Sequence, residues 1–257
     1  MKPVDQIQEK FEGKRPLFMP YFTLGYPDYD TALDVVEACA NAGADMMELG
    51  IPFSDPLADG PTIQRSTQVA LENGMTVERC LTAVSTLRAR NITIPFLLMG
   101  YINPIITYGM ARFVADAASA GANGFIIPDL PLAEADEFIA LCREHGMATV
   151  FLVAPNSPPE RIALAVEKST GFTYLVSVMG VTGARTAVST NLAAFVERVR
   201  TAGDGKLAVG FGISNPEQAA EVGKLADGVI VGSALIKVVD AAEDKPAAAG
   251  QFVAQFC

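Results

Sequence analysis

The stretch LAVGFGISNPEQAAEVGKLADGVIVGSA (residues 207–234) carries a pattern that points to the fold. Its two apolar runs, Leu207–Phe211 and Gly228–Val231, have the length of buried strands, and the segment Asn215–Lys224 between them has the length of a helix. A glycine-containing turn follows each run. The stretch therefore predicts a strand, a helix and a second strand, an arrangement typical of a parallel sheet.

The same alternation extends through the rest of the chain. Six earlier apolar runs have strand length: Leu17–Leu24, Met46–Ile51, Pro95–Met99, Gly124–Ile127, Ala148–Val153 and Phe172–Val178. Helix-length segments lie between or after the runs: Asp30–Ala42, Thr76–Arg90, Pro131–His145, Pro158–Lys168, Thr190–Thr201 and Ser233–Phe256. The runs lack polar alternation, as expected for strands covered on both faces. Eight such units in 257 residues favour an α/β protein with a (β/α)8 TIM-barrel fold over an open doubly wound sheet.

The pattern of alternating strands and helices continues without a break, which indicates a single domain. No linker rich in Pro or Ser and no run of charges divides the chain, so we expect one domain over residues 1–257. The polar, mildly amphipathic segment Met1–Gly13 is expected to add a helix before the first strand. The pattern is weakest at Tyr101–Tyr108, which contains a proline, and leaves open whether this segment is a loop.

The composition excludes several classes of protein. Lys and Arg total 19 against 29 Asp and Glu, and the resulting net charge of −10 argues against binding to duplex nucleic acid or an anionic membrane. A single histidine, His145, rules out a metal site built from several histidines. The cysteines are widely spaced and form no C-x-x-C pair: Cys39, Cys80, Cys142 and Cys257. Without a secretory signal or an apolar run long enough to span a membrane, we expect a cytoplasmic protein, or a plastid stromal one if a eukaryotic transit peptide was removed.

Two glycine-rich turns predict a phosphate site. In a barrel, the loops after strands seven and eight are neighbours and often bind phosphate through backbone N–H groups. Here they contain Gly210, Phe211 and Gly212 after the seventh run, and Gly232 and Ser233 after the eighth. The alternative is that the glycines only shape tight turns. Two such turns at adjacent strand ends favour phosphate binding.

A third glycine-bearing loop follows the sixth run. The sequence MGVTGAR (residues 179–185) is long and rich in small residues, and we interpret it as a candidate lid over the site. An ordinary surface loop is the alternative.

Two carboxylates predict proton-transfer chemistry. Glu48 lies within the second apolar run, where a carboxylate is costly unless it is paired or used, and an apolar site would raise its pKa towards neutrality. Asp59 follows in a loop bounded by Pro and Gly that can fold over the barrel mouth, although a turn residue is the alternative role. No lysine directly follows a predicted strand, so Schiff-base chemistry is not expected. The remaining chemistry is acid and base catalysis.

Several motifs resemble those of the tryptophan synthase alpha subunit family. The most specific is ELGIPFSDPLADGPTIQ (48–64), and others follow the same order along the chain: PYFTLGYP (20–27), PDLP (128–131), GVTG (180–183), GFGIS (210–214) and GSA (232–234). The resemblance implies a (β/α)8 barrel that cleaves indole-3-glycerol phosphate to indole and glyceraldehyde 3-phosphate in tryptophan biosynthesis. It further implies a retro-aldol mechanism without a metal or a Schiff base.

The resemblance also implies roles for individual residues. Glu48 would be the acid and base, Asp59 would stabilise the positive charge at the indole nitrogen, and Tyr174 would support the catalytic pocket. Tyr21 would line the indole pocket, and Thr182 would help to close the lid over Asp59. The phosphate would be held by Gly183, Phe211, Gly212, Gly232 and Ser233. The MGY sequence (99–101) departs from the family pattern because Gly100 replaces a larger pocket residue.

A partner protein is implied as well. Family members work with a beta subunit that contains pyridoxal phosphate, in an α2β2 assembly, whereas the alpha chain has no cofactor of its own. The loops 52–60 and 178–189 would face this partner, and Pro52 and Asp55 are the expected contact residues.

Two other classes of function remain open on sequence grounds. A different phosphate-binding barrel enzyme, such as a sugar-phosphate isomerase or a prenyl transferase, shares the glycine turns but does not account for Glu48 with Asp59. A non-enzymatic ligand-binding protein has no need for a buried acid.

Overall fold

The computed structural model describes residues 1–13, 16–176, 185–210 and 212–257. In the described part the strands form one nine-stranded parallel sheet in the order β5-β4-β3-β2-β1-β9-β8-β7-β6. The strands are β1 Leu17–Thr23, β2 Met47–Gly50, β3 Phe96–Met99, β4 Gly124–Ile126, β5 Ala148–Val150, β6 Leu152–Val153, β7 Thr173–Val176, β8 Leu207–Gly210 and β9 Gly228–Val231. Their order brings the two ends of the sheet to β5 and β6, which are consecutive in the chain.

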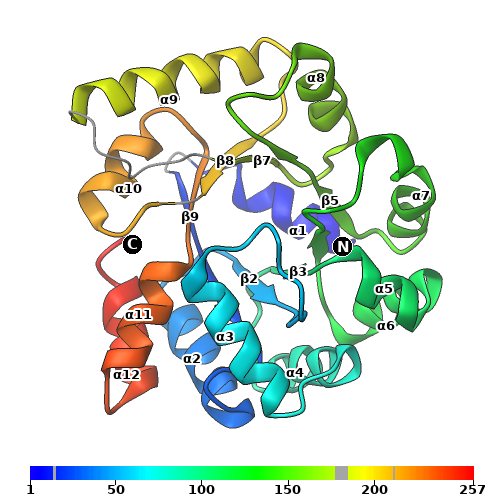
Figure 1. Cartoon of the computed structure of the whole chain (residues 1–257), viewed down its shortest axis with the longest axis vertical. Coiled ribbons are helices and arrows are strands. Elements are labelled where there is room, and N and C mark those ends of the chain that lie inside the picture. Colours follow the sequence, from blue (N-terminus) through cyan, green and yellow to red (C-terminus); the bar gives the residue numbers. More distant parts are fainter. Residues whose placement is uncertain (14–15, 177–184, 211) are drawn as a thin grey trace.

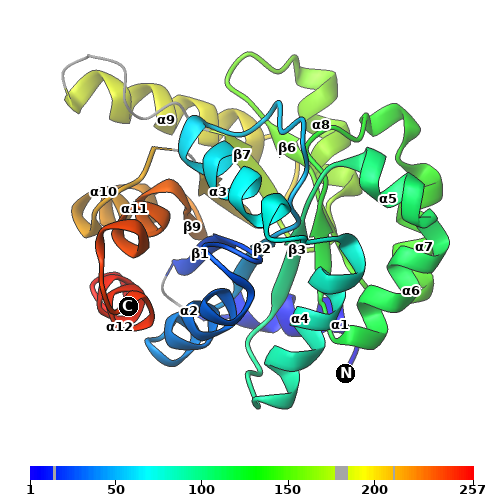
Figure 2. The same cartoon turned by 60° about the horizontal axis from the view of Figure 1, so that its bottom comes forward.

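The predicted TIM barrel is confirmed, with one strand divided. The expected run Ala148–Val153 is split at Phe151 into β5, which pairs with β4, and β6, which pairs with β7. The backbone N–H of Phe151 donates to the hydroxyl of Ser169 (3.1 Å) instead of to a neighbouring strand. The two short strands together occupy one strand position, so the sheet is a nearly closed barrel surrounded by helices (Figures 1 and 2).

The helices surround the sheet, and together with one short 3-10 helix, η1, they complete the βα units. They are α1 Pro3–Lys10, α2 Tyr29–Asn41, α3 Pro61–Glu72, α4 Val77–Ala89, α5 Ile102–Tyr108, α6 Met110–Ala120, η1 Leu132–Glu134, α7 Asp136–Glu144, α8 Pro159–Lys168, α9 Arg185–Arg200, α10 Pro216–Gly223, α11 Ser233–Ala241 and α12 Lys245–Val253. Side chains cap several of them. The carboxylate of Asp28 accepts from the N–H of Thr31 (2.9 Å), and the amide oxygen of Asn215 accepts from Gln218 (2.9 Å).

Several helices differ from the sequence prediction. The segment that the pattern left open is the helix α5, because Pro104 lies within its first turn, where a missing N–H is tolerated. Gly109, with a φ of 97°, separates α5 from α6. The predicted helical region Ser233–Phe256 consists of two helices, α11 and α12, and α9 begins at Arg185 instead of Thr190.

The expected N-terminal helix is confirmed and covers the N-terminal end of the barrel. The N–H of Val4 in α1 donates to the carbonyl of Gly146 (2.9 Å), just before β5. The side chain of Asn123, just before β4, donates to the carbonyl of Pro3 (3.2 Å) and to the Gln6 side chain (2.8 Å). The opposite, C-terminal end of the strands is left for the functional site.

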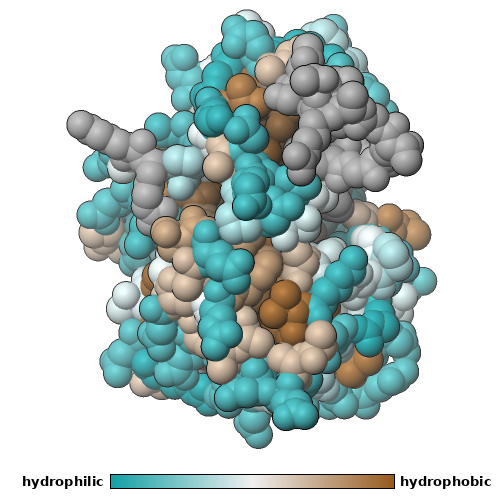
Figure 3. Space-filling model, turned by 90° about the vertical axis from the view of Figure 1, so that its left-hand side faces the viewer, coloured by the Kyte–Doolittle hydropathy of each residue, from teal (hydrophilic) through white to brown (hydrophobic). Residues whose placement is uncertain are grey.

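Strands and helices both contribute side chains to the interior. All residues of β1, β2, β3, β8 and β9 are buried, and aromatic residues such as Phe22, Phe96, Phe125 and Phe172 fill the space between strands and helices. In the space-filling view, hydrophilic residues dominate the edges of the face shown, and apolar residues appear between them (Figure 3). Among the described residues, no helix is both long enough and apolar enough to cross a membrane.

Candidate active site

A cavity of about 270 Å³ lies at the C-terminal ends of the strands, close to the lower size of small-molecule sites. It is lined by residues from distant parts of the chain, among them sequence-predicted ones: Tyr21, Glu48, Asp59, Tyr174, Gly212, Gly232 and Ser233. Ile63, Met99 and Ile230 add apolar surface. A second depression, lined by Thr31 and residues 243–246, is open to solvent and contains none of the predicted site residues. The first cavity is therefore the candidate active site.

Glu48 is held inside the barrel by strand register. It lies beside Tyr21 of β1 and Leu97 of β3, and only 1% of its surface is exposed. Both of its carboxylate oxygens are buried without a hydrogen-bond partner among the described residues. Burial raises the pKa of Glu48 to about 8, because the charged form loses its hydration and gains no compensating contact. Glu48 is therefore a neutral acid at pH 7.

Asp59 reaches the same cavity from the loop that precedes α3. The hydroxyl of Tyr101 donates to Oδ2 of Asp59 (2.9 Å) and accepts from the backbone N–H of Ala58 (3.0 Å). Oδ1 of Asp59 is buried without a partner among the described residues. Burial raises the pKa of Asp59 to about 6, and the hydrogen bond from Tyr101 opposes that rise. Asp59 is therefore mainly ionised at pH 7.

Tyr101 is a site residue that the sequence did not predict as one. It directly follows the glycine after β3, is 5% exposed and lies against the Phe53 ring, with 5.4 Å between the ring centroids. The available signal was its position just beyond a strand end. Its contact with Asp59, 42 residues earlier, depends on how the loop folds.

Two tyrosines enclose the carboxylates. Tyr21 and Tyr174 are buried, and burial raises the pKa of both phenols, with further upward effects from the charges of Glu48 and Asp59. Both hydroxyls lie over glycines. A Cβ at Gly50 would be 2.2 Å from the Tyr21 hydroxyl, and one at Gly210 would be 2.1 Å from the Tyr174 hydroxyl. Glycine at these positions allows the tyrosines to reach the cavity.

Helix starts and glycine turns form the other wall of the cavity. Gly232 and Ser233 lie at the start of α11, and Gly212, with a φ of 80°, and Ser214 precede α10. A helix N-terminus presents backbone N–H groups that favour an anion. Lys237, one turn further along α11, also lines this cavity. The sequence contains no signal for Lys237, because it does not directly follow a strand but lies within the helix after β9.

Other predicted residues lie apart or cannot be placed. Thr182, Gly183, Phe211 and the expected lid up to residue 184 lie outside the described residues. In the loop after β2, Asp55 is exposed and accepts a hydrogen bond from the Ser54 hydroxyl (2.5 Å). Pro52 is buried, so Asp55 is the member of this pair that another protein can reach.

This geometry defines a class of protein. A parallel α/β barrel with a neutral acid and an ionised carboxylate in one cavity, beside helix N-termini, is a TIM-barrel enzyme suited to moving protons on an anionic substrate.

Comparison with known proteins identifies the family. A family model described as "Tryptophan synthase alpha chain" matches residues 7–256. The tryptophan synthase alpha chain of Chloroflexus aggregans is 54% identical over 237 residues, which cover 91% of this chain and 89% of that protein. The crystal structure of tryptophan synthase subunit alpha from Legionella pneumophila superposes with a TM-score of 0.91 at 34% identity, covering 100% of this chain and 97% of that one. A tryptophan synthase structure from Mycobacterium tuberculosis, in an aminoacrylate-bound form, gives a TM-score of 0.87 at 35% identity over 100% of both chains.

The chain belongs to the tryptophan synthase alpha chain family. Members of this family are the tryptophan synthase subunits that cleave indole-3-glycerol phosphate in tryptophan biosynthesis. The chain is therefore a lyase of that pathway. The other two classes of function that the sequence left open are thereby set aside.

Proposed function

We propose that Glu48 is the acid and base of the cleavage and that Asp59 stabilises the charge that develops during it. The observation that carries this proposal is the burial of both Glu48 carboxylate oxygens in the cavity without a described partner. Such a group keeps its proton at neutral pH and can give it to a substrate placed beside it.

The proposed reaction conserves protons. Glu48 donates its proton to C3 of the indole ring, which turns the ring into an electron-accepting indoleninium. The bond from C3 to the glycerol carbon then breaks, and its electron pair returns to the ring. The Glu48 carboxylate takes the proton from the hydroxyl on the departing carbon, which becomes the aldehyde of glyceraldehyde 3-phosphate. Glu48 ends protonated, as it began.

Asp59 and the tyrosines have supporting roles in this proposal. The ionised carboxylate of Asp59 accepts a hydrogen bond from the indole N–H and stabilises its positive charge in a site of low dielectric constant. Tyr21 and the apolar residues line the indole pocket, while Tyr174 supports Glu48. Thr182 is proposed to close over Asp59 as part of a lid.

The phosphate is proposed to bind at the helix starts. Gly183, Phe211, Gly212, Gly232 and Ser233 would contact it, largely through backbone N–H groups. Binding there is remote from the reacting carbon and positions the indole C3 against Glu48.

The assembly is also part of the proposal. We infer that residues 1–257 act as one domain, without a cofactor of their own, and form an α2β2 complex with a beta subunit that carries pyridoxal phosphate. Asp55 would contact that partner, and Pro52 would fix the loop beneath it. The bacterial relatives favour the cytoplasm as the location.

Indole release from indole-3-glycerol phosphate tests the residue roles. Glu48→Gln keeps the size of the side chain but cannot exchange a proton, so we expect kcat to fall at least about a thousandfold, at the upper part of the range for general acid–base catalysis. Asp59→Asn should also lower kcat strongly, because the carboxamide carries no charge. Glu134→Gln, at an exposed position of η1, is the matched control and should behave as the wild type. Near-full activity of Glu48→Gln would contradict the mechanism.

A further inference from the structure

The residue roles proposed above leave the negative charge of the substrate phosphate without a positively charged partner in the cavity. Among the described residues, the charged side chains that line it are Glu48, Asp59 and Lys237. The substrate adds a phosphate to a cavity that already holds an ionised Asp59. The residues proposed to bind that phosphate are uncharged. Lys237 is the one described cation that lines the cavity.

We propose that Lys237 supplies the positive charge for the substrate phosphate, and that the ion pair of Arg65 with Asp240 keeps Lys237 available for it. The inference rests on the proposed function, since it assumes that the phosphate binds at the start of α11. It adds a charged binding residue to that subsite and a second residue that acts through it.

The helix geometry directs Lys237 towards the phosphate. Ser233, Lys237 and Asp240 are spaced by four and then three residues, so they lie on one face of α11. Side chains of a helix tilt towards its N-terminus, which brings the Lys237 stem back along the Ser233 side. Lys237 is exposed at the cavity rim, and no described residue accepts a hydrogen bond or forms an ion pair with it. Its ammonium group is therefore free to meet an anion.

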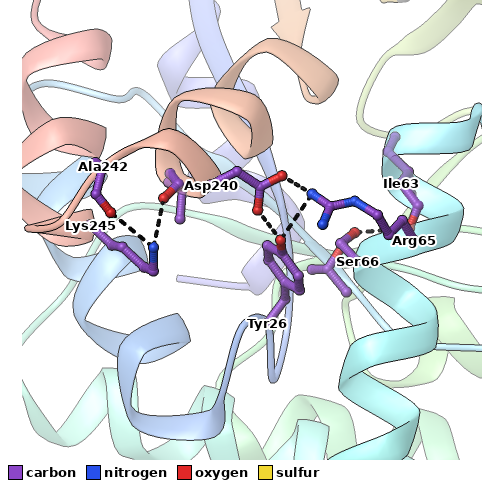
Figure 4. Close-up of polar contacts among 9 residues, drawn as sticks. Tyr26, Ile63, Arg65, Ser66, Asp240, Ala242 and Lys245 are labelled. Carbon is purple, nitrogen blue, oxygen red and sulfur yellow. Dashed lines mark hydrogen bonds and ion pairs between the residues drawn. The ribbon is translucent and has the colours of Figure 1, made fainter.

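Asp240 is the group on the same helix that could capture Lys237. At a spacing of three residues on a helix, an aspartate and a lysine are close enough to pair. Here the Asp240 carboxylate instead pairs with Arg65 of α3 and accepts a hydrogen bond from the Tyr26 hydroxyl (Figure 4). Arg65 also donates to the Tyr26 hydroxyl (3.2 Å), so the three side chains form one cluster.

The other lysine near this helix is already engaged. At the C-terminal end of α11, Nζ of Lys245 donates to the carbonyl of Ala242 (2.9 Å; Figure 4). It also donates to the carbonyl of Val239 (3.1 Å). Lys245 therefore binds backbone carbonyl groups at the C-terminal end of α11. Lys237 remains available to bind an anion near the N-terminal end of the same helix.

A pair of ligands that differ only in the phosphate tests the role of Lys237. Indole-3-propanol and its phosphate ester can both be followed by indole fluorescence, because the chain contains no Trp. Lys237→Gln should weaken binding of the ester by about tenfold and leave the alcohol unchanged, the loss expected for one charged hydrogen bond. It should also reduce the salt dependence of ester binding. Lys237→Arg should recover most of the affinity, because it retains the charge.

Lys224→Gln is the matched control, because Lys224 is exposed and pairs with Glu221 on α10, outside the cavity lining. Equal ester affinity in Lys237→Gln and the wild type would overturn the inference, as would an equal loss for the alcohol and the ester. Each variant is also assayed with indole-3-glycerol phosphate. If the wild type releases no indole, the proposed function fails. If it does and Lys237→Gln retains the wild-type KM, only this inference fails.

Arg65 is a positioning residue in the proposal, and a double-mutant cycle tests it. Arg65→Gln removes the ion-pair partner of Asp240, whose carboxylate can then pair with Lys237, so ester binding should weaken severalfold. In the Lys237→Gln background the same substitution should have no further effect on the ester, because the lysine to be captured is absent. An equal loss in both backgrounds, or no loss in either, would show that Arg65 does not act through Lys237.

Discussion

Glu48 and Asp59 show how environment divides two carboxyl groups between opposite roles. Glu48 lies on a strand, with no described partner for either oxygen, whereas Asp59 lies in a loop and receives the Tyr101 hydrogen bond. Burial raises both pKa values, to about 8 for Glu48 and about 6 for Asp59. Between these values one group is an acid and the other an anion, which is the pair of states that the proposed cleavage needs.

The pH dependence of kcat/KM follows from these two groups. Activity should rise with pH as Asp59 loses its proton near pH 6, and fall as Glu48 loses its proton near pH 8. Initial rates of indole release across pH 5–9 would measure this profile. A constant kcat/KM throughout that range would contradict the assignment. Asp59→Asn should remove the lower limb from whatever activity remains.

At the residue scale, the sequence predicted the buried acid Glu48 but not all of the residues that form the site around it. Glu48 was identifiable because a carboxylate within an apolar strand is unusual, and the direction of its pKa shift followed from burial alone. Tyr101 and Lys237 were not identified, because the contact of Tyr101 with Asp59 and the place of Lys237 in the cavity lining depend on how a loop and a helix pack. Contacts between residues far apart in the sequence have no local pattern.

At the scale of elements, the segment after β3 holds the loop that carries Asp59. Tyr101 both donates to Asp59 and accepts from Ala58, so one hydroxyl fixes the loop's backbone and its carboxylate. In the middle of α3, the hydroxyl of Ser66 contacts the hydroxyl of Thr23 in β1 (2.7 Å). The end of the loop that leads into α3 is thus held by Tyr101, and α3 itself is fixed against β1.

Tyr101→Phe should lower kcat/KM by roughly tenfold, the effect of losing one hydrogen bond to a charged group. Because that hydrogen bond favours the charged carboxylate, its loss should raise the pKa of Asp59 and move the lower limb of the pH profile to higher pH. Tyr108→Phe provides the matched control, since Tyr108 donates to Asp116 (2.7 Å) and does not line the cavity. A lower limb that stays in place in Tyr101→Phe would count against this role.

Strands were predicted more completely than helices. Each strand is a short apolar run buried on both faces, and this property is local. The helices α3 and α6 were not predicted, and α5 was left open, because each lies next to loop-like residues: Pro61 at the start of α3, and Pro104 and Gly109 around α5. Here Pro61 starts α3, Pro104 lies in the first turn of α5 and Gly109 ends α5, but proline and glycine also occur in turns.

At the scale of the whole molecule, the two ends of the barrel differ: one is covered by a helix and the other holds the functional site. Helix α1 covers the N-terminal end of the strands, while the cavity and the exposed loop with Asp55 lie at the C-terminal end. The count of eight apolar runs and the length predicted this architecture. The break at Phe151 could not be predicted, because it arises from the Ser169 hydroxyl, 18 residues further along the chain.

The proposed partner should alter the rate of the whole assembly. Adding a tryptophan synthase beta subunit from a related bacterium should raise the rate of indole formation roughly fivefold or more, the lower end of typical coupling between sites. Asp55→Ala should weaken this stimulation. Asp204→Ala, an exposed acid before β8 at the opposite end of the barrel, should not. No rate change at micromolar concentrations of both proteins would argue against the partnership.

The protonation state of Glu48 is the most direct test of the account. Infrared difference spectra between the wild type and Glu48→Gln isolate the carbonyl band of a protonated carboxyl group. If Glu48 is the buried acid, this band is present at pH 7 and disappears with a midpoint near pH 8. Absence of the band at pH 7, with ionisation complete near the ordinary pKa of 4.5, would contradict that role.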